Sequence, residues 1–274
     1  KYIKFNSFAN FIQSKKNINR KNTEDRIINI YKKESFFSKL TKYKKKIIKE
    51  AISDLFYKTH KILPKFELTK NVIAEIDNLK DEDILNYIFH RYRYEIFPQK
   101  KIQDDYPPYL QIEPSSICNF RCVFCFETDN SFTNKKNGFM GKMKVELFKK
   151  IIDDARGKIE FISLASRGEP FVNDKMEEIL KYTNDKFLGL KINTNASLLN
   201  EKKCHSILSG GVSTIVFSAD AADSKLYKKL RVNGSLEKVF KNIEMFNKIK
   251  EKHYKQTKII TRVSGVKFSN QQNI

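Results

Sequence analysis

Three cysteines lie within eight residues of one another, at Cys118, Cys122 and Cys125, in the spacing C-x3-C-x2-C. This spacing lets a single loop place three sulfurs around one metal centre, which neither a helix nor a strand can do. Three thiolates can hold a [4Fe–4S] cluster and leave one iron open. An open coordination position is a place where a small molecule is held and chemically changed, as in catalytic zinc sites. The spacing therefore favours an enzyme over a structural clip.

Two other interpretations of these cysteines stay open: a zinc site, and cysteines without any metal. A zinc site ordinarily needs a fourth Cys or His, and the histidines are distant in sequence, although a fold can bring one close; they are His60, His90, His205 and His253. Bunched cysteines are a poor disulfide framework, which favours the reducing cytoplasm. The fourth cysteine, Cys204, lies in a predicted helix and is expected to be a small hydrophobic residue there.

The formal net charge of +21 is compatible with a nucleic-acid partner, but its distribution disfavours one. Residues 1–65 contain 18 Lys or Arg and 5 Asp or Glu, so most of the excess lies far from the cysteines. A lysine-rich solvated surface is the simpler explanation, and an anionic partner is the alternative. No run approaches the roughly 18 apolar residues that a membrane span needs, and nothing resembles a signal peptide. These features predict a cytoplasmic protein.

Helical periodicity dominates the N-terminal part of the chain. Between Phe5 and about Phe97 the apolar residues recur at helical spacing, and a helix is expected to begin near Asp81, where acidic residues favour a helix N-terminus. Residues 1–105 are therefore predicted to form an all-helical accessory region. Pro107 and Pro108 break this pattern.

Residues 106–274 alternate between strand and amphipathic helix. Strands are predicted at 109–113, 159–165, 187–193, 214–218 and 258–263, with helices between them. Such alternation indicates an α/β fold of right-handed βα units, whose active residues gather at the carboxyl ends of parallel strands. We expect a partial (β/α)6 barrel that is incomplete at its C-terminus, because a sixth strand would need another βα unit.

The cysteine loop resembles that of the radical S-adenosylmethionine (SAM) enzymes, and the resemblance extends over residues 109–266. It implies that Cys118, Cys122 and Cys125 ligate a [4Fe–4S] cluster whose open iron is chelated by the amino and carboxylate groups of SAM. The aromatic residue before the third cysteine, Phe124, is then expected near the adenine; a core aromatic is the alternative.

The run Ser166-Arg167-Gly168-Glu169-Pro170 resembles the "GGEP" motif of that family. In the family this segment contacts the amino group of SAM, so Gly168 and Glu169 are candidate SAM-binding residues. A carboxylate suits an ammonium partner, and a glycine permits close approach of the backbone. Arg167 departs from the pattern because it stands where the first glycine usually lies.

Further candidates stand at the ends of the next strands. Asn195, in a segment that resembles "TNG" with Ala196 in place of glycine, is expected to face cofactor or substrate or to cap a turn. Ser218, in a segment like "SLDG", is the better ribose candidate beside Asp220, which has a helix cap as its alternative role.

Two arginines complete the candidates. Arg231 resembles the residue that pairs with the SAM carboxylate in some subfamilies, because its guanidinium binds a carboxylate in bidentate fashion; a solvated charge is the alternative. Arg262 interrupts an apolar strand, and it needs a ligand anion or Glu169 as a partner if it faces the barrel interior. It can equally face outwards.

The resemblance implies an enzyme that cleaves SAM reductively and abstracts hydrogen from a peptide or carbohydrate substrate. It implies an electron donor such as flavodoxin or ferredoxin, and the flanking residues resemble the SPASM subgroup, which carries auxiliary clusters in a C-terminal extension. Two alternatives remain: a non-catalytic iron–sulfur or zinc module that docks on nucleic acid or an acidic partner, and a radical SAM enzyme that modifies RNA. Salt dependence would separate them.

Overall fold

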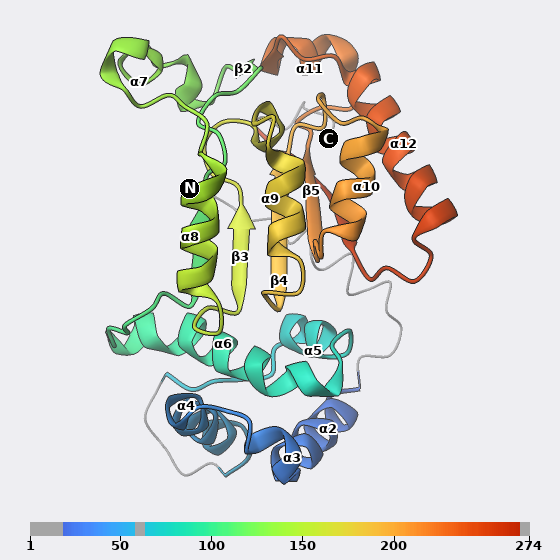
Figure 1. Ribbon diagram of the computed structural model, residues 1–274. Helices are drawn as coiled ribbons and strands as arrows, with labels where there is room; N and C mark the ends of the chain where they lie inside the picture. Colours follow the sequence, from blue (N-terminus) through green and yellow to red (C-terminus); the bar gives the residue numbers. More distant parts are fainter. Residues whose placement is uncertain (1–18, 58–63, 269–274) are drawn as a thin grey trace. The chain divides into compact units, whose positions relative to one another are not determined.

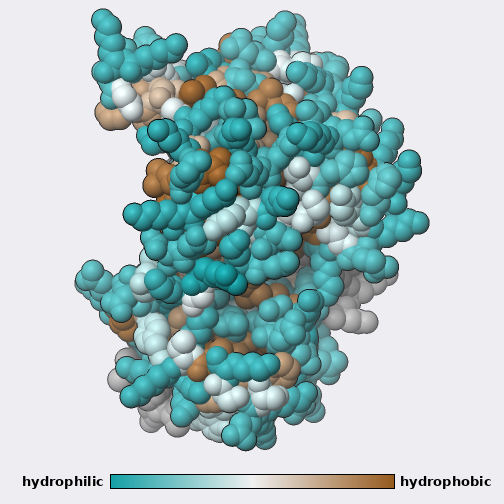
Figure 2. Space-filling model, viewed as in Figure 1, coloured by the Kyte–Doolittle hydropathy of each residue, from teal (hydrophilic) through white to brown (hydrophobic). Residues whose placement is uncertain are grey.

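A computed structural model describes residues 19–57 and 64–268. The chain divides into two compact units, Lys1–Pro108 and Tyr109–Ile274 (Figure 1). The helical pattern predicted between Phe5 and residue 18 lies outside the described residues. The surface shown in Figure 2 is mostly hydrophilic, as the charged composition requires. No helix in the described ranges has both the length and the apolar character of a membrane span.

The described part of the first unit is helical, which confirms the prediction for this region. Side chains of Asn19, Thr41 and Thr69 accept hydrogen bonds from backbone N–H groups in the first turns of three helices, which would otherwise lack partners. The longest helix begins with three acidic residues at Asp81, as expected. The elements are α2 (Arg20–Lys32), α3 (Glu34–Phe37), α4 (Lys42–Ile52), η1 (Ser53–Tyr57), α5 (Lys70–Ile76) and α6 (Asp81–Lys100).

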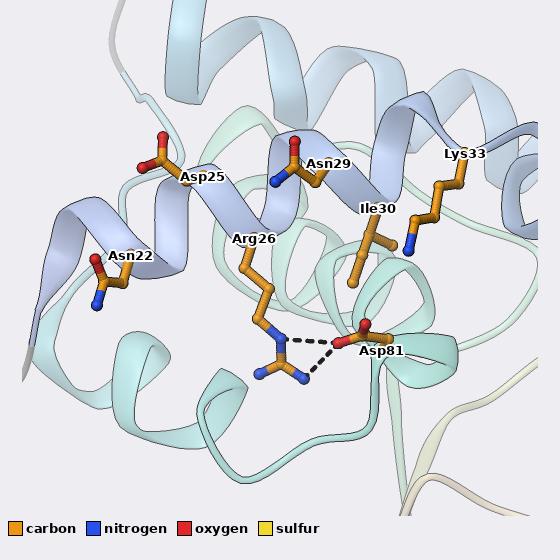
Figure 3. A pocket seen from close by; sticks show the side chains of 7 residues that line it. All are labelled: Asn22, Asp25, Arg26, Asn29, Ile30, Lys33 and Asp81. Atoms are coloured by element: carbon orange, nitrogen blue, oxygen red, sulfur yellow. Dashed lines mark hydrogen bonds and ion pairs between the residues drawn. The ribbon is translucent and has the colours of Figure 1, made fainter.

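A polar hollow of about 350 Å³ lies on α2 beside the start of α6 (Figure 3). Arg26 lines it and donates from Nε to Asp81 Oδ1 at 2.9 Å. Its other nitrogens donate to the carbonyls of Ile76 and Leu79 at 3.0 and 2.8 Å, at the end of α5. Arg26 thereby joins α2 to the last residue of α5, to the turn that follows it and to the start of α6, so it serves the packing of the helical unit.

We expect His90 to make the stability of the helical unit dependent on pH. It is buried in α6, and its Nδ1 donates to the Pro108 carbonyl at 2.8 Å. Burial lowers the pKa of His90 to about 3, so the unfolded chain binds a proton more readily than the folded one. We expect the free energy of unfolding to fall below pH 6.5 by about 1.4 kcal/mol per pH unit, until the pH reaches the folded pKa. Urea unfolding of the full chain between pH 7 and 4.5 measures this slope.

The control for this prediction is His90→Gln, which removes the titrating group and keeps a hydrogen-bond donor. Its unfolding free energy should lie lower at pH 7 and change less with pH. An equal slope in both proteins would assign the pH dependence to other groups.

The second unit is an α/β unit built on one five-stranded parallel sheet, which confirms the predicted fold class. The strands are ordered β1-β3-β4-β5-β7, and every neighbouring pair is parallel. They are β1 (Tyr109–Ile112), β3 (Phe161–Leu164), β4 (Gly189–Thr194), β5 (Thr214–Ser218) and β7 (Ile260–Ser264). The helices that connect them are α8 (Val145–Ala155), α9 (Met176–Thr183), α10 (Glu201–Ser209), α11 (Ser224–Leu230) and α12 (Leu236–His253).

Several short elements lie in the cysteine loop and in the loops that follow the main strands. Strand β2 pairs antiparallel with β6, and this pairing sets Cys122 opposite Arg231. These elements are β2 (Arg121–Cys122), η2 (Phe126–Thr128), α7 (Asn130–Thr133), η3 (Lys135–Asn137), η4 (Pro170–Val172) and β6 (Arg231–Val232).

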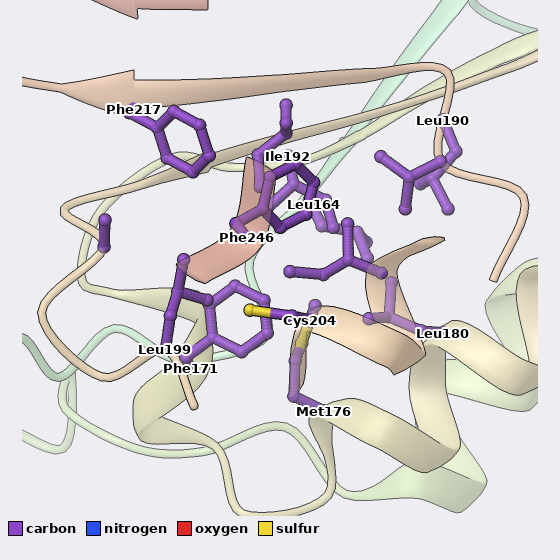
Figure 4. Packing of buried hydrophobic residues seen from close by; sticks show 14 of the residues in the cluster. Leu164, Phe171, Met176, Leu180, Leu190, Ile192, Leu199, Cys204, Phe217 and Phe246 are labelled. Atoms are coloured by element: carbon purple, nitrogen blue, oxygen red, sulfur yellow. The ribbon is translucent and has the colours of Figure 1, made fainter. Parts of the chain in front are cut away.

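The hydrophobic core lies between one face of the sheet and the helices that cover it (Figures 1 and 4). Alternate strand residues such as Leu164, Ile192 and Phe217 meet helix residues such as Phe246. Cys204 is fully buried in this core, near Met176 in Figure 4, which confirms its expected role as a small hydrophobic residue. Burial raises the pKa of its thiol to about 11, so it is poorly reactive.

The opposite face of the sheet carries several polar residues among apolar ones, and these side chains point away from the core because side chains alternate between the two faces of a strand. We call it the inner face. The pairing register sets residues of neighbouring strands opposite one another, and we call each such set of residues a row. One row contains Gln111, Ser163, Lys191, Thr214 and Ile260, and the next contains Asn193, Val216 and Arg262. Ser218 and Ser264 form a row at the carboxyl ends.

Candidate active site

The three cysteines lie on the loop that follows β1, and all are free and half-buried. The Phe120 N–H donates to Cys118 Sγ at 3.4 Å, and the Cys125 N–H donates to the Cys122 carbonyl at 2.9 Å. Arg121 Nη1 donates to the carbonyls of Cys118 and Phe120 at 2.7 and 2.8 Å. The side chain of Arg121 thus holds the turn that carries the first two cysteines.

Burial also governs the chemistry of these thiols. It raises the pKa of Cys118 to about 11, and it raises the pKa of Cys122 while the positive charge of Arg231 acts in the opposite direction. Thiolates are the form that binds metal, so loading this loop must release protons. Within the described ranges, no three His, Cys, Asp or Glu side chains gather around a point suitable for a single metal ion.

Gly168 packs directly on the segment that precedes the first cysteine. Its φ is +66°, and an added Cβ would lie 2.2 Å from the Ser115 carbonyl oxygen and 2.9 Å from that of Ile117. Glu169, the next residue, also contacts this segment, because its backbone N–H donates to the Ile117 carbonyl at 3.0 Å. The glycine is therefore required by both backbone conformation and space.

We expect Gly168→Ala to lower the free energy of unfolding by about 2–4 kcal/mol, because left-handed strain adds to overpacking against backbone atoms. Gly138→Ala is the matched control: its φ is +72° and nothing lies within 4 Å of the added Cβ, so only strain of about 1 kcal/mol should appear. Denaturant unfolding of both variants measures the difference. Equal losses would show that the close approach at Gly168 contributes nothing.

The carboxylate of Glu169 is fully buried and accepts three hydrogen bonds. Thr194 Oγ1 and the Asn195 N–H donate at 2.7 Å each, and the Phe171 N–H donates at 3.2 Å. Burial raises the pKa of Glu169, and these hydrogen bonds and the charge of Lys203 oppose that rise. Glu169 thereby joins the end of β3 to the end of β4. Its donors are these groups and not Arg262, the alternative partner that the sequence offers.

Asn195 joins the end of β4 to the cysteine loop. Its Nδ2 donates to Asn119 Oδ1 at 3.0 Å and lies 3.9 Å from Cys118 Sγ. Asn119 Nδ2 donates to Ser197 Oγ at 2.8 Å, and Ser197 Oγ donates to Asn195 Oδ1 at 2.7 Å. The three side chains form a closed ring of hydrogen bonds. The Ser197 N–H also donates to Asn195 Oδ1, so the expected turn cap exists together with the contact to the loop.

Ala196, the departure from "TNG", adopts a left-handed conformation with φ +61°. It is also fully buried. A glycine reaches this conformation without the steric penalty that Cβ imposes, which explains why glycine suits the position.

Arg231 and Asp220 form a buried ion pair. Arg231 Nε donates to Asp220 Oδ2 at 2.6 Å, and the side chains are 8% and 1% exposed. Asp220 Oδ1 also accepts from the Val266 N–H at 2.8 Å. Arg231 is therefore not a solvated charge, and Asp220 is not the cap of α11. That cap is Asp223, whose side chain accepts from the Leu226 N–H at 2.8 Å.

Arg167, which stands at a glycine position of "GGEP", is bound by Glu113, the residue that follows β1. The Arg167 N–H and Nε donate to Glu113 Oε2 at 2.9 and 3.0 Å, and the guanidinium lies 4.5 Å from the centre of the Phe132 ring. The guanidinium is thus directed at the helical turn after the third cysteine.

Phe124 and Ser218 are the two remaining candidates. Phe124 is 39% exposed, packs against Phe268 with ring centres 4.8 Å apart, and lies 5.9 Å from the Arg231 guanidinium. It is therefore not a core aromatic. Ser218 is the last residue of β5 and is half-buried.

Asn119, Ser197 and Arg121 contribute to this site, although the sequence did not single them out. Asn119 and Arg121 lie between cysteines of the motif, and that position was the available signal. Ser197 carried no signal of its own, because its role depends on a contact across 78 residues.

A comparison with protein families decides the class. The model of the radical SAM superfamily matches residues 112–261, more than half of the chain. The chain belongs to the radical SAM superfamily. The family consists of enzymes that use a [4Fe–4S] cluster and SAM.

Individual relatives within the superfamily are distant. A tungsten-containing aldehyde ferredoxin oxidoreductase cofactor-modifying protein of Pyrococcus furiosus is 31% identical over 41% of this chain and 30% of its own length. A probable GTP 3′,8-cyclase of Methanococcus maripaludis is 30% identical over 49% of this chain and 43% of its own. The chain thus spans less than half the length of these curated relatives.

Among solved structures, SuiB of Streptococcus suis bound to its precursor peptide SuiA is similar. It has a TM-score of 0.48 and 20% identity, and the match covers 85% of this chain and 47% of SuiB.

The residues of this radical SAM domain suit both cofactors. Three free thiols share one loop, and a four-iron cluster takes each thiolate on a different iron, so they need not converge on one ion. Neither the hollow on α2 nor a second one, of about 540 Å³ between α9 and α10, is lined by these cysteines or by the strand-end candidates.

Proposed function

We propose that Cys118, Cys122 and Cys125 ligate the [4Fe–4S] cluster of this radical SAM enzyme. One observation supports this most: the cysteine loop is fastened to the ends of β3 and β4 through the Gly168 segment and through Asn195. Such fastening fixes three sulfurs beside the strand ends, where βα folds bind their ligands.

We further propose that SAM lies across the strand ends. Glu169 uses three acceptor positions internally, and a carboxylate offers about four, so one remains for the SAM ammonium. Arg231 has five N–H donors and can take the SAM carboxylate while Nε keeps its bond to Asp220. Gly168 and Asn195 flank Glu169, and Ser218 offers a hydroxyl to the ribose. Phe124, part-exposed beside Arg231, is the proposed adenine contact.

The cluster and SAM supply the radical chemistry, and the protein supplies binding, orientation and exclusion of water. The ion pair of Asp220 with Arg231 holds the guanidinium still, so that a bound carboxylate meets an oriented donor. Asn195 and Arg121 hold the loop from its two sides. In this proposal each of these residues orients another group and does not itself react.

The substrate and partners are proposed at a coarser level. We propose a peptide or carbohydrate substrate, and a flavodoxin or ferredoxin as the electron donor. We place the enzyme in the cytoplasm, because free thiols and a reduced cluster require a reducing compartment.

Anaerobic reconstitution of the full-length protein with iron and sulfide, followed by dithionite reduction in the presence of SAM, tests the function. We expect 5′-deoxyadenosine and methionine in equal amounts, because reductive cleavage of one SAM yields one of each. Their quantification by liquid chromatography is the measurement. A protein that assembles a cluster and binds SAM but releases no 5′-deoxyadenosine would contradict the proposal.

A further inference from the structure

The inner face of the sheet carries two cations that the SAM site does not use. Lys191 lies on β4 and Arg262 on β7, with β5 between them. The register places Lys191 opposite Thr214, and Arg262 opposite Val216, one row nearer the carboxyl ends. Strands are about 4.8 Å apart and rise about 3.3 Å per residue, so two strands across and two residues along separate the two Cα atoms by roughly 12 Å. Two long side chains can span that distance and converge on one group.

Lys191 is half-buried, and no described residue forms a hydrogen bond or an ion pair with it. Burial lowers the pKa of its ammonium, and the like charge of Arg262 lowers it further. The acid at the end of β1, Glu113, is engaged by Arg167. The inner face therefore has an excess of positive charge around Lys191.

Asn193 adds a hydrogen-bonding requirement at the same place. It lies two residues beyond Lys191 on β4, in the same row as Arg262. Its Oδ1 is buried and has no hydrogen-bond partner. A buried acceptor of this kind costs free energy unless a donor reaches it. A ligand with an anionic group and a nearby hydroxyl or amine would give Lys191 and Asn193 the partners they lack, and Arg262 offers five N–H donors beside them.

We propose that the inner face binds an anionic group of the substrate between Lys191 and Arg262, with Asn193 accepting a hydrogen bond from the same molecule. This inference rests on the proposed function, and it specifies the substrate as one that carries a carboxylate or a phosphate. The cations lie one and two rows below Ser218 on the inner face. An anion held there places the rest of the substrate beside SAM at the strand ends.

Binding of inorganic phosphate and of acetate to the full chain tests this inference without requiring turnover. The titrations follow phosphate by ³¹P NMR and acetate by calorimetry, in wild type, Lys191→Gln, Arg262→Gln and Lys248→Gln. Lys248 is an exposed lysine of α12 and is the matched control. We expect each inner-face variant to bind roughly tenfold more weakly or worse, because a charge-assisted hydrogen bond is lost, while the control is unchanged. Preference for phosphate or for acetate identifies the anion.

A second measurement uses only the wild-type chain, so it does not depend on the folding of a variant. Phosphate should slow the acetylation of Lys191 by an amine-reactive ester and leave that of Lys248 unchanged, as read by peptide mass spectrometry. Equal binding by all four proteins, or no protection of Lys191, overturns the inference. Loss of SAM cleavage with retained anion binding would overturn only the proposed function.

Discussion

Replacing Cys118, Cys122 or Cys125 by alanine is expected to abolish formation of 5′-deoxyadenosine. Each substitution removes one of three thiolates, and the resulting site has too few protein ligands to retain the cluster against loss of iron. We expect iron and sulfide contents after anaerobic reconstitution to fall with activity, and the visible absorption of the cluster to disappear. The loss should be essentially complete, because two thiolates are too few to hold a four-iron cluster.

Cys204→Ala is the matched control for these variants. Its thiol is buried in the helix-facing core, away from the loop, and its loss should cost about 1 kcal/mol of stability without changing iron content. Full activity in any of the three loop variants, or loss of iron in Cys204→Ala, would contradict the ligand assignment.

Asp220→Ala is expected to lower the free energy of unfolding by about 3–5 kcal/mol, because it leaves the buried Arg231 without its counter-charge. It also removes the acceptor of the Val266 N–H. Denaturant unfolding measures the loss. SAM affinity should fall as well, since the guanidinium is no longer held in one orientation.

Two comparisons isolate the pair. The double variant Asp220→Ala/Arg231→Met should be less destabilised than Asp220→Ala, because it removes the uncompensated charge. Glu178→Ala breaks an exposed pair with Lys149 at 2.8 Å and should leave the free energy of unfolding almost unchanged, because solvent screens the two charges. A double variant that is destabilised as much as Asp220→Ala, or more, would show that the uncompensated charge of Arg231 is not the source of the effect.

Much of the fold could be predicted because periodicity is local. The strands predicted at 109–113 and 214–218 coincide closely with β1 and β5, and the acidic start at Asp81 marks the beginning of α6. Short apolar runs between amphipathic helices specify parallel strands almost unaided. The need for glycine at position 168 could likewise be predicted, because the motif requires a close approach of two backbone segments there.

The partners of the site residues could not be predicted, because they depend on contacts between distant segments. The pairing of Asp220 with Arg231 is a tertiary contact, and a helix cap was the nearer local alternative for Asp220. The pairing of Arg167 with Glu113 joins two strand ends, 54 residues apart. A sequence pattern indicates which residues are polar at strand ends, but the register and the loops decide which of them meet.

The ring formed by Asn119, Asn195 and Ser197 has a consequence for repair of the enzyme. Together with the bond from Glu169 to Ile117, it fastens the cysteine loop entirely through contacts between protein atoms. None of these contacts includes an atom of a cluster, so the destruction of a cluster by oxygen removes none of their partners. A damaged molecule would therefore keep its thiols gathered at the strand ends, and a new cluster could be inserted without refolding the domain.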